Sequence, residues 1–577
     1  MATAPRHTPR RRRVWAPRLV LLGPGVGYWL VLFLIPIGLL LAYSFFMRGP
    51  FGGVEYEFTF SNYTRLVDPL YVRVLLTSLR IALVTTGIAL ALGYPAAYFI
   101  ATAPRKRRLV LLMLVILPFW TSFLIRTYSW MVLLNPAGLI NKLLGVFDVG
   151  PLPLLYNEGS IVVGLVYAYL PLMILPIYSS IERLGDGPRE AAQDLFARPW
   201  STFRRVLLPL TLPGVVAGCI FVFVPSMGNF IVPDLLGGGK AVMVGNLIQQ
   251  QFLSARDWPF GATLAVAVIG IMLVLLGGQA AVLRREQGTA ERSPTESHAG
   301  RRRGRGRLRA HMGLVYAFLY LPIAVLVVLS FNASSLPTAW GGFSTKWYRA
   351  LLDNEPLIAS VRTTLVVAVF VTAISTVLGT LLAIGLHRTV RSRFLDSALF
   401  VPAVIPDIVL AIGLLSFFNL VSAPLGVGTI VLSHVVFDMI FVAAIVRTRL
   451  GYFDVRIEEA AQDLYAGPLS TFLRVTLPVI APGIVAGALV AFTLSVDEFV
   501  IAFFNSGPTS ITFPIKVYSM IRFGVTPEIN AIAAIVPRNR AGGQPGAHPG
   551  GAAAVARPGR PGRDRAARVA PSDLTRR

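Results

Sequence analysis

Four carboxylates stand next to or inside long apolar stretches of the sequence, where a charged side chain is costly unless it has a partner or a function. They are Asp234, Asp407, Asp497 and Glu498. Aromatic side chains, whose faces attract cations, are frequent in the segment 117 to 134, which includes Trp120 and Tyr128. Carboxylates and aromatic faces together suit a path for an organic cation. The alternative is that each acid is an interfacial residue or the partner of Arg126 or of another span.

Other kinds of chemistry find little support in the sequence. His434 and Asp438 are four residues apart on one helix face, and this spacing favours a satisfied intramembrane pair over a metal site. The single cysteine, Cys219, lies in an apolar run, which excludes a disulfide framework and a cysteine-based metal site. There is no G-x-x-x-x-G-K-[ST] loop for nucleotide phosphates and no catalytic triad. We therefore expect a conduit that is not an enzyme by itself and that binds no cofactor or metal.

The composition is that of a polytopic membrane protein. Of the 577 residues, 55% are hydrophobic and only 14% are charged, and several apolar runs are long enough to cross a bilayer. The net charge of +25 is concentrated in three arginine-rich segments, 1 to 18, 284 to 309 and 537 to 577. The first two lie beside predicted spans, so the positive-inside rule explains them without a nucleic-acid partner.

The apolar runs predict two groups of membrane spans. The first group lies near 20–44, 74–101, 108–133, 158–179, 206–227 and 259–283, and the second near 312–331, 359–386, 396–419, 429–449 and 475–498. Alternation from a cytoplasmic N-terminus puts the basic segment 103 to 108 on the cytoplasmic side. Both groups then have the same orientation. This is an all-α parallel repeat of about six helices each, paired around a central path.

The two groups are aligned by a repeated segment. Residues 190 to 218 occur again at 459 to 487, and 20 of the 29 aligned positions are identical. Pro188 and Glu190 favour a helix that begins near 187, because proline fits the first turn and a carboxylate complements the helix dipole there. We expect Pro199 to end this helix. Arg204 and Arg205 then mark the cytoplasmic side of the following span.

The triplet Glu-Ala-Ala followed by Leu208-Pro209 resembles the EAA loop of ABC-importer permeases, and the second copy does so equally. The resemblance implies the type I ABC-importer permease fold and two loops, 187–209 and 455–478, that couple to ATP-hydrolysing subunits. The coupling residues that it implies are Glu190, Ala191, Ala192, Asp194, Leu208, Pro209, Glu459, Ala460, Ala461, Asp463, Leu477 and Pro478. One departure is that Phe196 and Tyr465 stand where the family usually has glycine.

Further segments are similar to the spermidine/putrescine branch of these permeases. The first half resembles one permease subunit through 117–134, 151–156, 233–238 and 243–261, and the second half resembles its partner subunit through 329–352, 405–418 and 493–533. Asn229 stands where this branch usually has aspartate. The resemblance implies a fusion of both subunits in the bacterial inner membrane.

The implied partners follow from the same resemblance. We expect two ATPase subunits, which would hold ATP and Mg²⁺, an extracytoplasmic solute-binding protein and a polyamine substrate, with no nucleic acid. Ferric iron or thiamine remains an alternative cargo, and an ion-coupled secondary transporter an alternative class.

The predicted domains are a basic N-terminus (1–19), a first permease domain (20–283), a basic linker (284–311), a second permease domain (312–536) and a tail (537–577). At the offset of 269, the last span of the first half aligns with an apolar run that stops at Val536. We predict that a frameshift near codon 536, natural or a sequencing error, has removed the last helix. A disordered tail after a re-entrant segment is the alternative.

Overall fold

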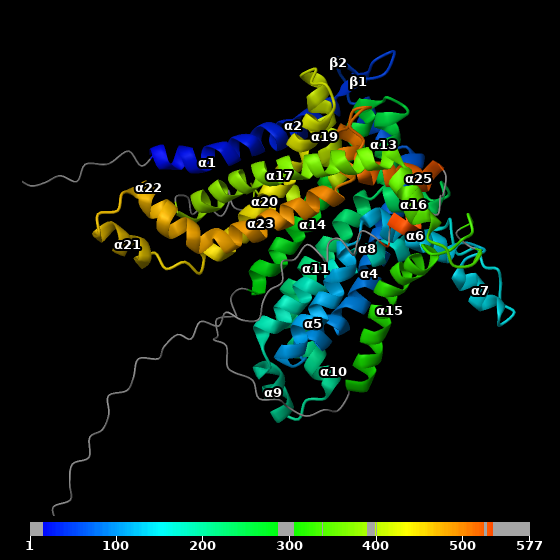
Figure 1. Cartoon of the computed structure of the whole chain (residues 1–577), viewed down its shortest axis with the longest axis horizontal. Coiled ribbons are helices and arrows are strands. Elements are labelled where there is room, and N and C mark those ends of the chain that lie inside the picture. Colours follow the sequence, from blue (N-terminus) through cyan, green and yellow to red (C-terminus); the bar gives the residue numbers. More distant parts are fainter. Residues whose placement is uncertain are drawn as a thin grey trace, which may run out of the picture.

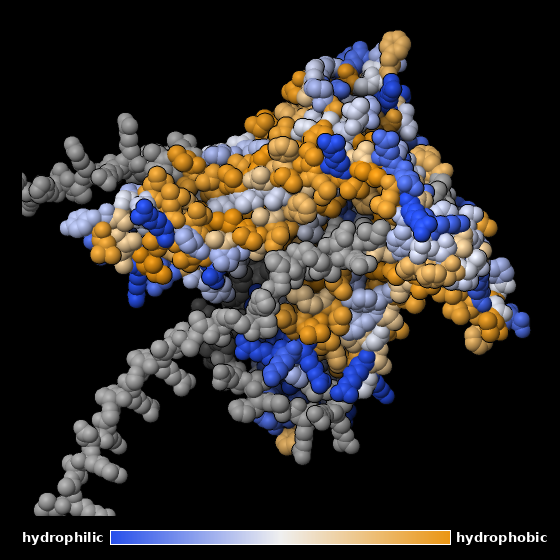
Figure 2. Space-filling model, viewed as in Figure 1, coloured by the Kyte–Doolittle hydropathy of each residue, from blue (hydrophilic) through white to orange (hydrophobic). Residues whose placement is uncertain are grey.

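The computed structural model describes residues 15–286, 305–336, 339–388, 398–399, 401–523, 528–532 and 534. Within this part of the chain, nine helices are long and apolar enough to cross a membrane, and a bent pair of helices raises this number to ten if it is one span. Figure 2 shows hydrophobic side chains along the flanks of the long helices and hydrophilic ones gathered toward the ends. The predicted all-α polytopic architecture is confirmed.

The first half contains the hairpin and the helices that precede residue 287. Its elements are α1 (Trp15–Trp29), α2 (Ile35–Tyr43), β1 (Phe46–Arg48), β2 (Val54–Phe58), α3 (Ser61–Leu66), α4 (Pro69–Ala101), α5 (Arg105–Ile116), α6 (Phe123–Leu134), α7 (Leu139–Gly145), α8 (Glu158–Leu184), α9 (Gly187–Asp194), α10 (Pro199–Thr202), α11 (Leu208–Gly228), α12 (Ile231–Gly237), α13 (Val244–Leu253) and α14 (Trp258–Glu286). The strands β1 and β2 form one antiparallel hairpin.

The second half repeats this order with small changes. Its elements are α15 (Arg305–Leu329), α16 (Lys346–Asp353), α17 (Glu355–Arg388), α19 (Asp407–Leu420), α20 (Val427–Leu450), α21 (Arg456–Asp463), α22 (Pro468–Thr471), α23 (Leu477–Asp497), α24 (Val500–Asn505) and α25 (Phe513–Phe523). Helical residues 528–532 and 534 follow, and the whole predicted tail (537–577), with the predicted frameshift near codon 536, lies outside the described residues.

The third predicted span of each half is broken. The run 108–133 divides into α5, a 3₁₀ turn (Leu117–Trp120) and α6, and the two helical parts meet at 82°. The run 396–419 is interrupted by a 3₁₀ turn (Val401–Ala403) before α19 begins. Pro118, Pro402 and Pro406 explain the breaks, because proline lacks the backbone N–H that would continue the helix and biases the preceding residue away from helical angles. A span was predicted at each place, and the prolines divide it into shorter helical parts.

Three helices contain a π-helical turn, and each is followed at its second residue by proline. The turns are Leu30–Leu34, Phe203–Leu207 and Phe472–Thr476, and the prolines are Pro36, Pro209 and Pro478. A proline removes one hydrogen bond of the regular ladder, and a wider turn before it lets the helix continue. The spans that follow the repeated loops are therefore continuous from Pro199 to Gly228 and from Pro468 to Asp497.

The first helix of each half packs on the opposite half. Helices α1 and α2 contact α17 and α19, whereas α15 contacts α4 and α6. Tyr28 donates a hydrogen bond from its hydroxyl to the carbonyl of Leu432 at 2.7 Å, and Tyr320 donates one to the carbonyl of Leu114 at 2.9 Å. Figure 1 shows two arms that come together near α6, α13 and α25 and diverge toward α9 in one arm and α21 in the other.

Candidate substrate path and coupling loops

The two halves meet where the span after each repeated loop ends. Helix α11 ends at Gly228, and Asn229 and Phe230 lead into α12. At the same place in the second half α23 ends at Asp497, and Glu498 and Phe499 lead into α24. The sequence offset of 269 thus pairs a neutral junction with an acidic one.

The acidic junction gathers carboxylates from three elements. Glu498 is half-buried, and its Oε1 accepts a hydrogen bond from the backbone N–H of Ile501 at 3.0 Å, so the side chain is held at the start of α24. Asp407, the first residue of α19, and Asp438 on α20 are its electrostatic neighbours, as is the adjacent Asp497. Asp407 and Glu498, which are 91 residues apart in the sequence, are therefore neighbours in the fold.

Asp438 and His434 do not form the predicted pair. Both side chains are 2% exposed. The Nδ1 atom of His434 lies 3.1 Å from the Oγ atom of Ser495, while its Nε2 atom and the Oδ2 atom of Asp438 have no hydrogen-bond partner among the described residues. No group of three or more metal-ligating side chains occurs in the described ranges.

The neutral junction faces the acids across the boundary between the halves. Asn229 donates a hydrogen bond from Nδ2 to the hydroxyl of Tyr169 at 2.9 Å, and Tyr169 is an electrostatic neighbour of Asp407. A side chain at Gly228 would meet the Cβ atom of Pro406 at 2.5 Å. Glycine is therefore required at 228 for α19 of the second half to approach α11 so closely.

Aromatic rings close the boundary next to the junctions. Phe230 lies 6.1 Å from Phe499, its equivalent in the other half, and 6.1 Å from Phe503, measured between ring centroids. Tyr518 on α25 extends the group, with its ring 4.9 Å from that of Phe499. Phe230 and Phe499 are buried, and we call these four residues the aromatic plate. It is packed from both halves, so it can open only if the halves move apart.

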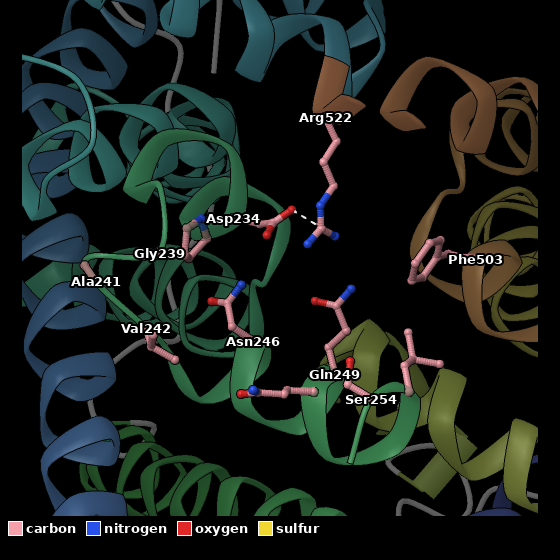
Figure 3. Close-up of a pocket in the computed structure, with 12 residues that line it drawn as sticks. Asp234, Gly239, Ala241, Val242, Asn246, Gln249, Ser254, Phe503 and Arg522 are labelled. Atoms are coloured by element: carbon pink, nitrogen blue, oxygen red, sulfur yellow. Dashed lines mark ion pairs between the residues drawn. The ribbon is translucent and has the colours of Figure 1, made fainter. Parts of the chain in front are cut away.

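A cavity of about 340 Å³ lies on the outer side of the plate, between α12 and α13 of the first half and α24 and α25 of the second (Figure 3). The hydroxyl of Tyr518 donates a hydrogen bond to Oδ2 of Asp234 at 2.5 Å and accepts one from Nη1 of Arg522 at 2.8 Å. The guanidinium of Arg522 is 3.5 Å from the same carboxylate oxygen. Asp234 thus joins the two halves beside this cavity, in contact with Tyr518 of the plate and with Arg522.

The aromatic candidates of the first half are less accessible. Tyr128 is completely buried in the core, and its hydroxyl has no hydrogen-bond partner in the described part of the chain. The backbone of Trp120 lies in the 3₁₀ turn after α5, but its side chain is outside the described residues. Arg126 is 4% exposed and lies over the ring of Phe119, 4.9 Å from its centroid. Its Nη1 atom also lies 3.5 Å from the backbone carbonyl of Ala168 on α8.

The repeated loops form short helices at the ends of the two arms. Helix α9 begins at Gly187 with Pro188 in its first turn, as predicted, but it ends at Asp194 and not at Pro199. The backbone of Phe196 adopts a left-handed conformation (φ 56°), which ends the helix, and Pro199 instead begins α10. Tyr465 does the same after α21 (φ 63°).

The predicted coupling residues surround these two helix ends. Glu190 is half-exposed and Glu459 exposed, and Asp194 and Asp463 are both exposed. Of the alanines, Ala192 is buried, Ala461 half-buried, and Ala191 and Ala460 exposed; the leucines Leu208 and Leu477 are half-buried, and Pro209 and Pro478 are exposed. Most of the predicted set is thus presented on the surface.

The two loops are joined to their spans differently. In the first, Trp200 packs on Phe203, Phe203 packs on Tyr94, and the Tyr94 hydroxyl is 2.9 Å from Oγ1 of Thr211. Arg189 lies 3.4 Å from the Tyr98 hydroxyl of α4.

In the second loop, Glu458 takes the position of Arg189. It is 8% exposed, pairs with Arg388 of α17 at 2.5 Å, and accepts a hydrogen bond from Thr476. This contact among Glu458, Arg388 and Thr476 was not predicted from the sequence. The repeat places a glutamate, Glu458, where the first loop has Arg189, and this difference in charge could have drawn attention to the position.

The comparisons with known proteins agree with this arrangement. The sequence profile of the binding-protein-dependent transport system inner membrane components matches residues 89–287. The spermidine/putrescine transport system permease protein PotB of Escherichia coli (strain K12) is 47% identical over 254 residues, which cover 43% of this chain and 92% of that protein. The chain is a binding-protein-dependent transport system inner membrane component.

Two other relatives and one solved structure are also similar to this inner membrane component. PotB of Haemophilus influenzae is 45% identical over 253 residues, covering 43% of this chain and 88% of that protein. The spermidine/putrescine transport system permease protein PotC of E. coli (strain K12) is 42% identical over 227 residues, covering 39% of this chain and 86% of that protein. A solved alginate ABC transporter in complex with its periplasmic protein overlaps less closely, with a TM-score of 0.39 and 16% identity over 46% of this chain and 93% of that chain.

The inner membrane component is therefore an ABC-importer permease, multi-pass in the inner membrane, and not an ion-coupled secondary transporter. Its length is about twice that of either relative, as a fusion of two permease subunits requires. Tyr169, Tyr518, Arg522 and Phe230 were not predicted as site residues. The offset of 269 would have drawn attention to Phe230 and Tyr169, which it pairs with Phe499 and Asp438.

Proposed function

We propose that this permease takes up polyamines such as spermidine and putrescine. The observation that carries the proposal is the position of Asp407 and Glu498, two half-buried carboxylates that lie together at the boundary between the halves, beside the aromatic plate. Carboxylates and aromatic faces bind organic ammonium groups. The spermidine/putrescine permeases among its relatives support the same cargo.

We also propose the partners. Two ATP-hydrolysing subunits, which would hold ATP and Mg²⁺, bind at the α9 and α21 loops. An extracytoplasmic solute-binding protein binds over the opposite mouth, above the cavity lined by Asp234 and Arg522. The permease binds no cofactor of its own.

The shape of the molecule supports a mechanism of alternating access. The arms diverge at the end that carries α9 and α21, while the plate and the Asp234–Tyr518–Arg522 contact join the halves at the other end (Figure 1). ATP binding would draw the two loops together, and the rocking of the halves would separate Phe230 from Phe499. A polyamine released by the binding protein would then reach Asp407 and Glu498, and hydrolysis would return the arms to the shape seen here.

Each of the four acids has its own role in the proposed path. Glu498 is fixed by the N–H of Ile501, so its charge is held in place for an incoming ammonium group. Asp407 begins α19 and faces Tyr169 of the other half. Asp497 adds charge to the same junction, while Asp234 belongs to the outer mouth.

The test is uptake of labelled spermidine and putrescine by cells that lack their own polyamine importers and receive this permease with its ATPase and binding protein. We expect saturable uptake that unlabelled polyamine blocks. Uptake of ferric iron or thiamine in its place would show another cargo. Failure of ATP depletion to stop uptake would contradict the proposed ATPase partners.

A further inference from the structure

Each coupling loop presents a bulky ring at a backbone position that favours glycine. Two hydrogen bonds close the end of helix α9. The N–H of Ala197 donates to the carbonyl of Ala192 at 3.0 Å, and the N–H of Phe196 donates to the carbonyl of Gln193 at 2.9 Å. This is the Schellman pattern, in which the residue after the helix is left-handed and usually glycine. Phe196 occupies that position at φ 56°.

The second loop repeats this geometry. The N–H of Ala466 binds the carbonyl of Ala461 at 3.1 Å, the N–H of Tyr465 binds that of Gln462 at 2.9 Å, and Tyr465 has φ 63°. A side chain with a Cβ atom is strained at such angles, and a bulky one is rarely found there. The fold therefore gains nothing from either ring at this place.

Nor are the rings covered by the rest of the chain. Phe196 is 95% exposed and Tyr465 is 98% exposed. Each directly follows a leucine that is 82% exposed, Leu195 or Leu464, and is followed four residues later by a second apolar side chain, Trp200 or Leu469, that is 70% exposed. Two matched apolar groups of this kind on one protein indicate a binding surface that is presented twice.

We propose that Phe196 and Tyr465 are anchors that insert into apolar pockets of two copies of one ATP-hydrolysing subunit. The inference rests on the proposed function for the identity of the partner and adds which residues select it. The partner is chosen because the surface occurs twice, because both copies lie at the ends of the arms that diverge, and because the permease belongs to a class of importers whose energy comes from ATP (Figure 1).

The strain gives the anchors a physical advantage. A left-handed residue directs its side chain away from the helix that it ends, so the ring projects beyond α9 or α21 while the exposed carboxylates of Asp194 and Asp463 remain on the helix. Exposed aromatic rings with few rotatable bonds lose little entropy on binding and commonly form the energetic centre of an interface. A subunit whose groove fits a loop with glycine here has no space for the ring, so the rings also exclude such partners.

Replacement of both rings by glycine tests the anchors, because it acts oppositely on folding and on binding. We would compare the full chain with the double variant Phe196→Gly and Tyr465→Gly in lipid nanodiscs. The readouts are the affinity for the ATP-hydrolysing subunit that is supplied with this chain in the uptake test, and the midpoint of thermal unfolding. We expect affinity to fall roughly tenfold or more for each ring, while the unfolding midpoint stays equal or rises because glycine relieves the strain.

Two matched variants complete the experiment. The exchange Phe196→Tyr with Tyr465→Phe keeps both rings and should keep the affinity. Phe51→Gly removes a ring that is 96% exposed near the outer hairpin, on the opposite side of the membrane, and should change neither readout.

Unchanged affinity of the glycine variant would refute the proposed role of Phe196 and Tyr465 as anchors. A fall in affinity that is accompanied by a lower unfolding midpoint would also refute it. Failure of the proposed function is distinguished by uptake in the unaltered chain: absence of polyamine uptake together with ring-dependent binding would refute the cargo and keep the anchors.

Discussion

The two halves of this permease have the same fold but differ in charge at the candidate path. At positions 269 apart, Asn229 corresponds to Glu498, Gly228 to Asp497 and Tyr169 to Asp438. The second half supplies the negative charge, whereas the first half supplies neutral hydrogen-bonding groups and the close approach at Gly228. The two halves therefore share the positions of their helices and differ in the side chains at the boundary.

The same contrast occurs at the coupling loops. Arg189 of the first loop pairs with Asp186 of the same loop and reaches α4 only through Tyr98, at 3.4 Å, whereas Glu458 of the second loop joins α21 to both Arg388 of α17 and Thr476. The second loop is therefore fixed to its neighbours by a buried charge, and the first by packed aromatic rings. The halves are equivalent in position but not in how their loops are held.

The largest expected effect follows from reversing the charge of both loops. Glu190→Lys combined with Glu459→Lys should abolish uptake, because both coupling helices would present the wrong charge to their partners and oppose the helix dipole. Uptake and the amount of permease in the membrane fraction are measured together. If each single reversal gives a different loss, the two loops transmit unequally. Normal uptake by the double variant with normal membrane insertion would refute the role of these helices.

A smaller effect is expected from removing the charge of Glu498 at the acidic junction and adding one at Asn229 at the neutral junction. Glu498→Gln keeps an oxygen for the N–H of Ile501 but removes the charge, so uptake efficiency should fall by roughly tenfold to a hundredfold, as for a lost hydrogen bond to a charged group. Asn229→Asp adds the corresponding charge to the first half. If the double variant, Glu498→Gln with Asn229→Asp, regains uptake, a charge on either side of the boundary is sufficient for transport. If it does not, the charge must lie in the second half.

The contacts of Glu458 and Arg189, which join the two loops to their spans, should differ in their contribution to stability. Glu458→Gln leaves Arg388 without its charged partner and should lower the free energy of unfolding by about 1–2 kcal/mol, since the pair is partly exposed to water. Arg189→Gln should cost less than about 1 kcal/mol. Thermal unfolding of the two purified variants in the same detergent makes the comparison. Equal shifts would show that the loops are held equally.

The smallest effects are expected at the contacts between the halves. Tyr28→Phe and Tyr320→Phe each remove one hydrogen bond to a backbone carbonyl of the opposite half, at a cost of about 0.5–1.5 kcal/mol. We expect similar falls in the unfolding midpoint for both. A clearly larger fall for one would show that the exchanged helices do not contribute equally to holding the halves together.

Sequence reasoning gave the parallel repeat, the places of most spans and the coupling loops, because long apolar runs and a repeated segment are local features. It did not include the breaks that prolines make within an apolar run, as at Pro118 and Pro406, since a span and a broken span have the same hydropathy. It also placed the end of the coupling helix at Pro199, because nothing in the letters of the sequence shows that Phe196 is left-handed.

The candidate path was predicted only in part, for a related reason. Asp407 and Glu498 are distant in sequence and were named separately, but their proximity depends on how α19 packs on the opposite half at Gly228. Asp234 was grouped with them, and its contacts with Tyr518 and Arg522 of the other half could not be read from the sequence. Tyr128 was assigned to the path from its residue type, and its burial became evident only from the packing of α6.

The exchange of α1 and α15 between the halves has a consequence for how the protein is made. The contact between Tyr28 and Leu432 closes a separation of 404 residues, so the first span is synthesised long before the surface that it covers. Such distant contacts form late, and the first span must meanwhile remain in the membrane without its final neighbours. In a single chain, however, both halves are always present at a fixed effective concentration, and assembly does not depend on how many copies the cell contains.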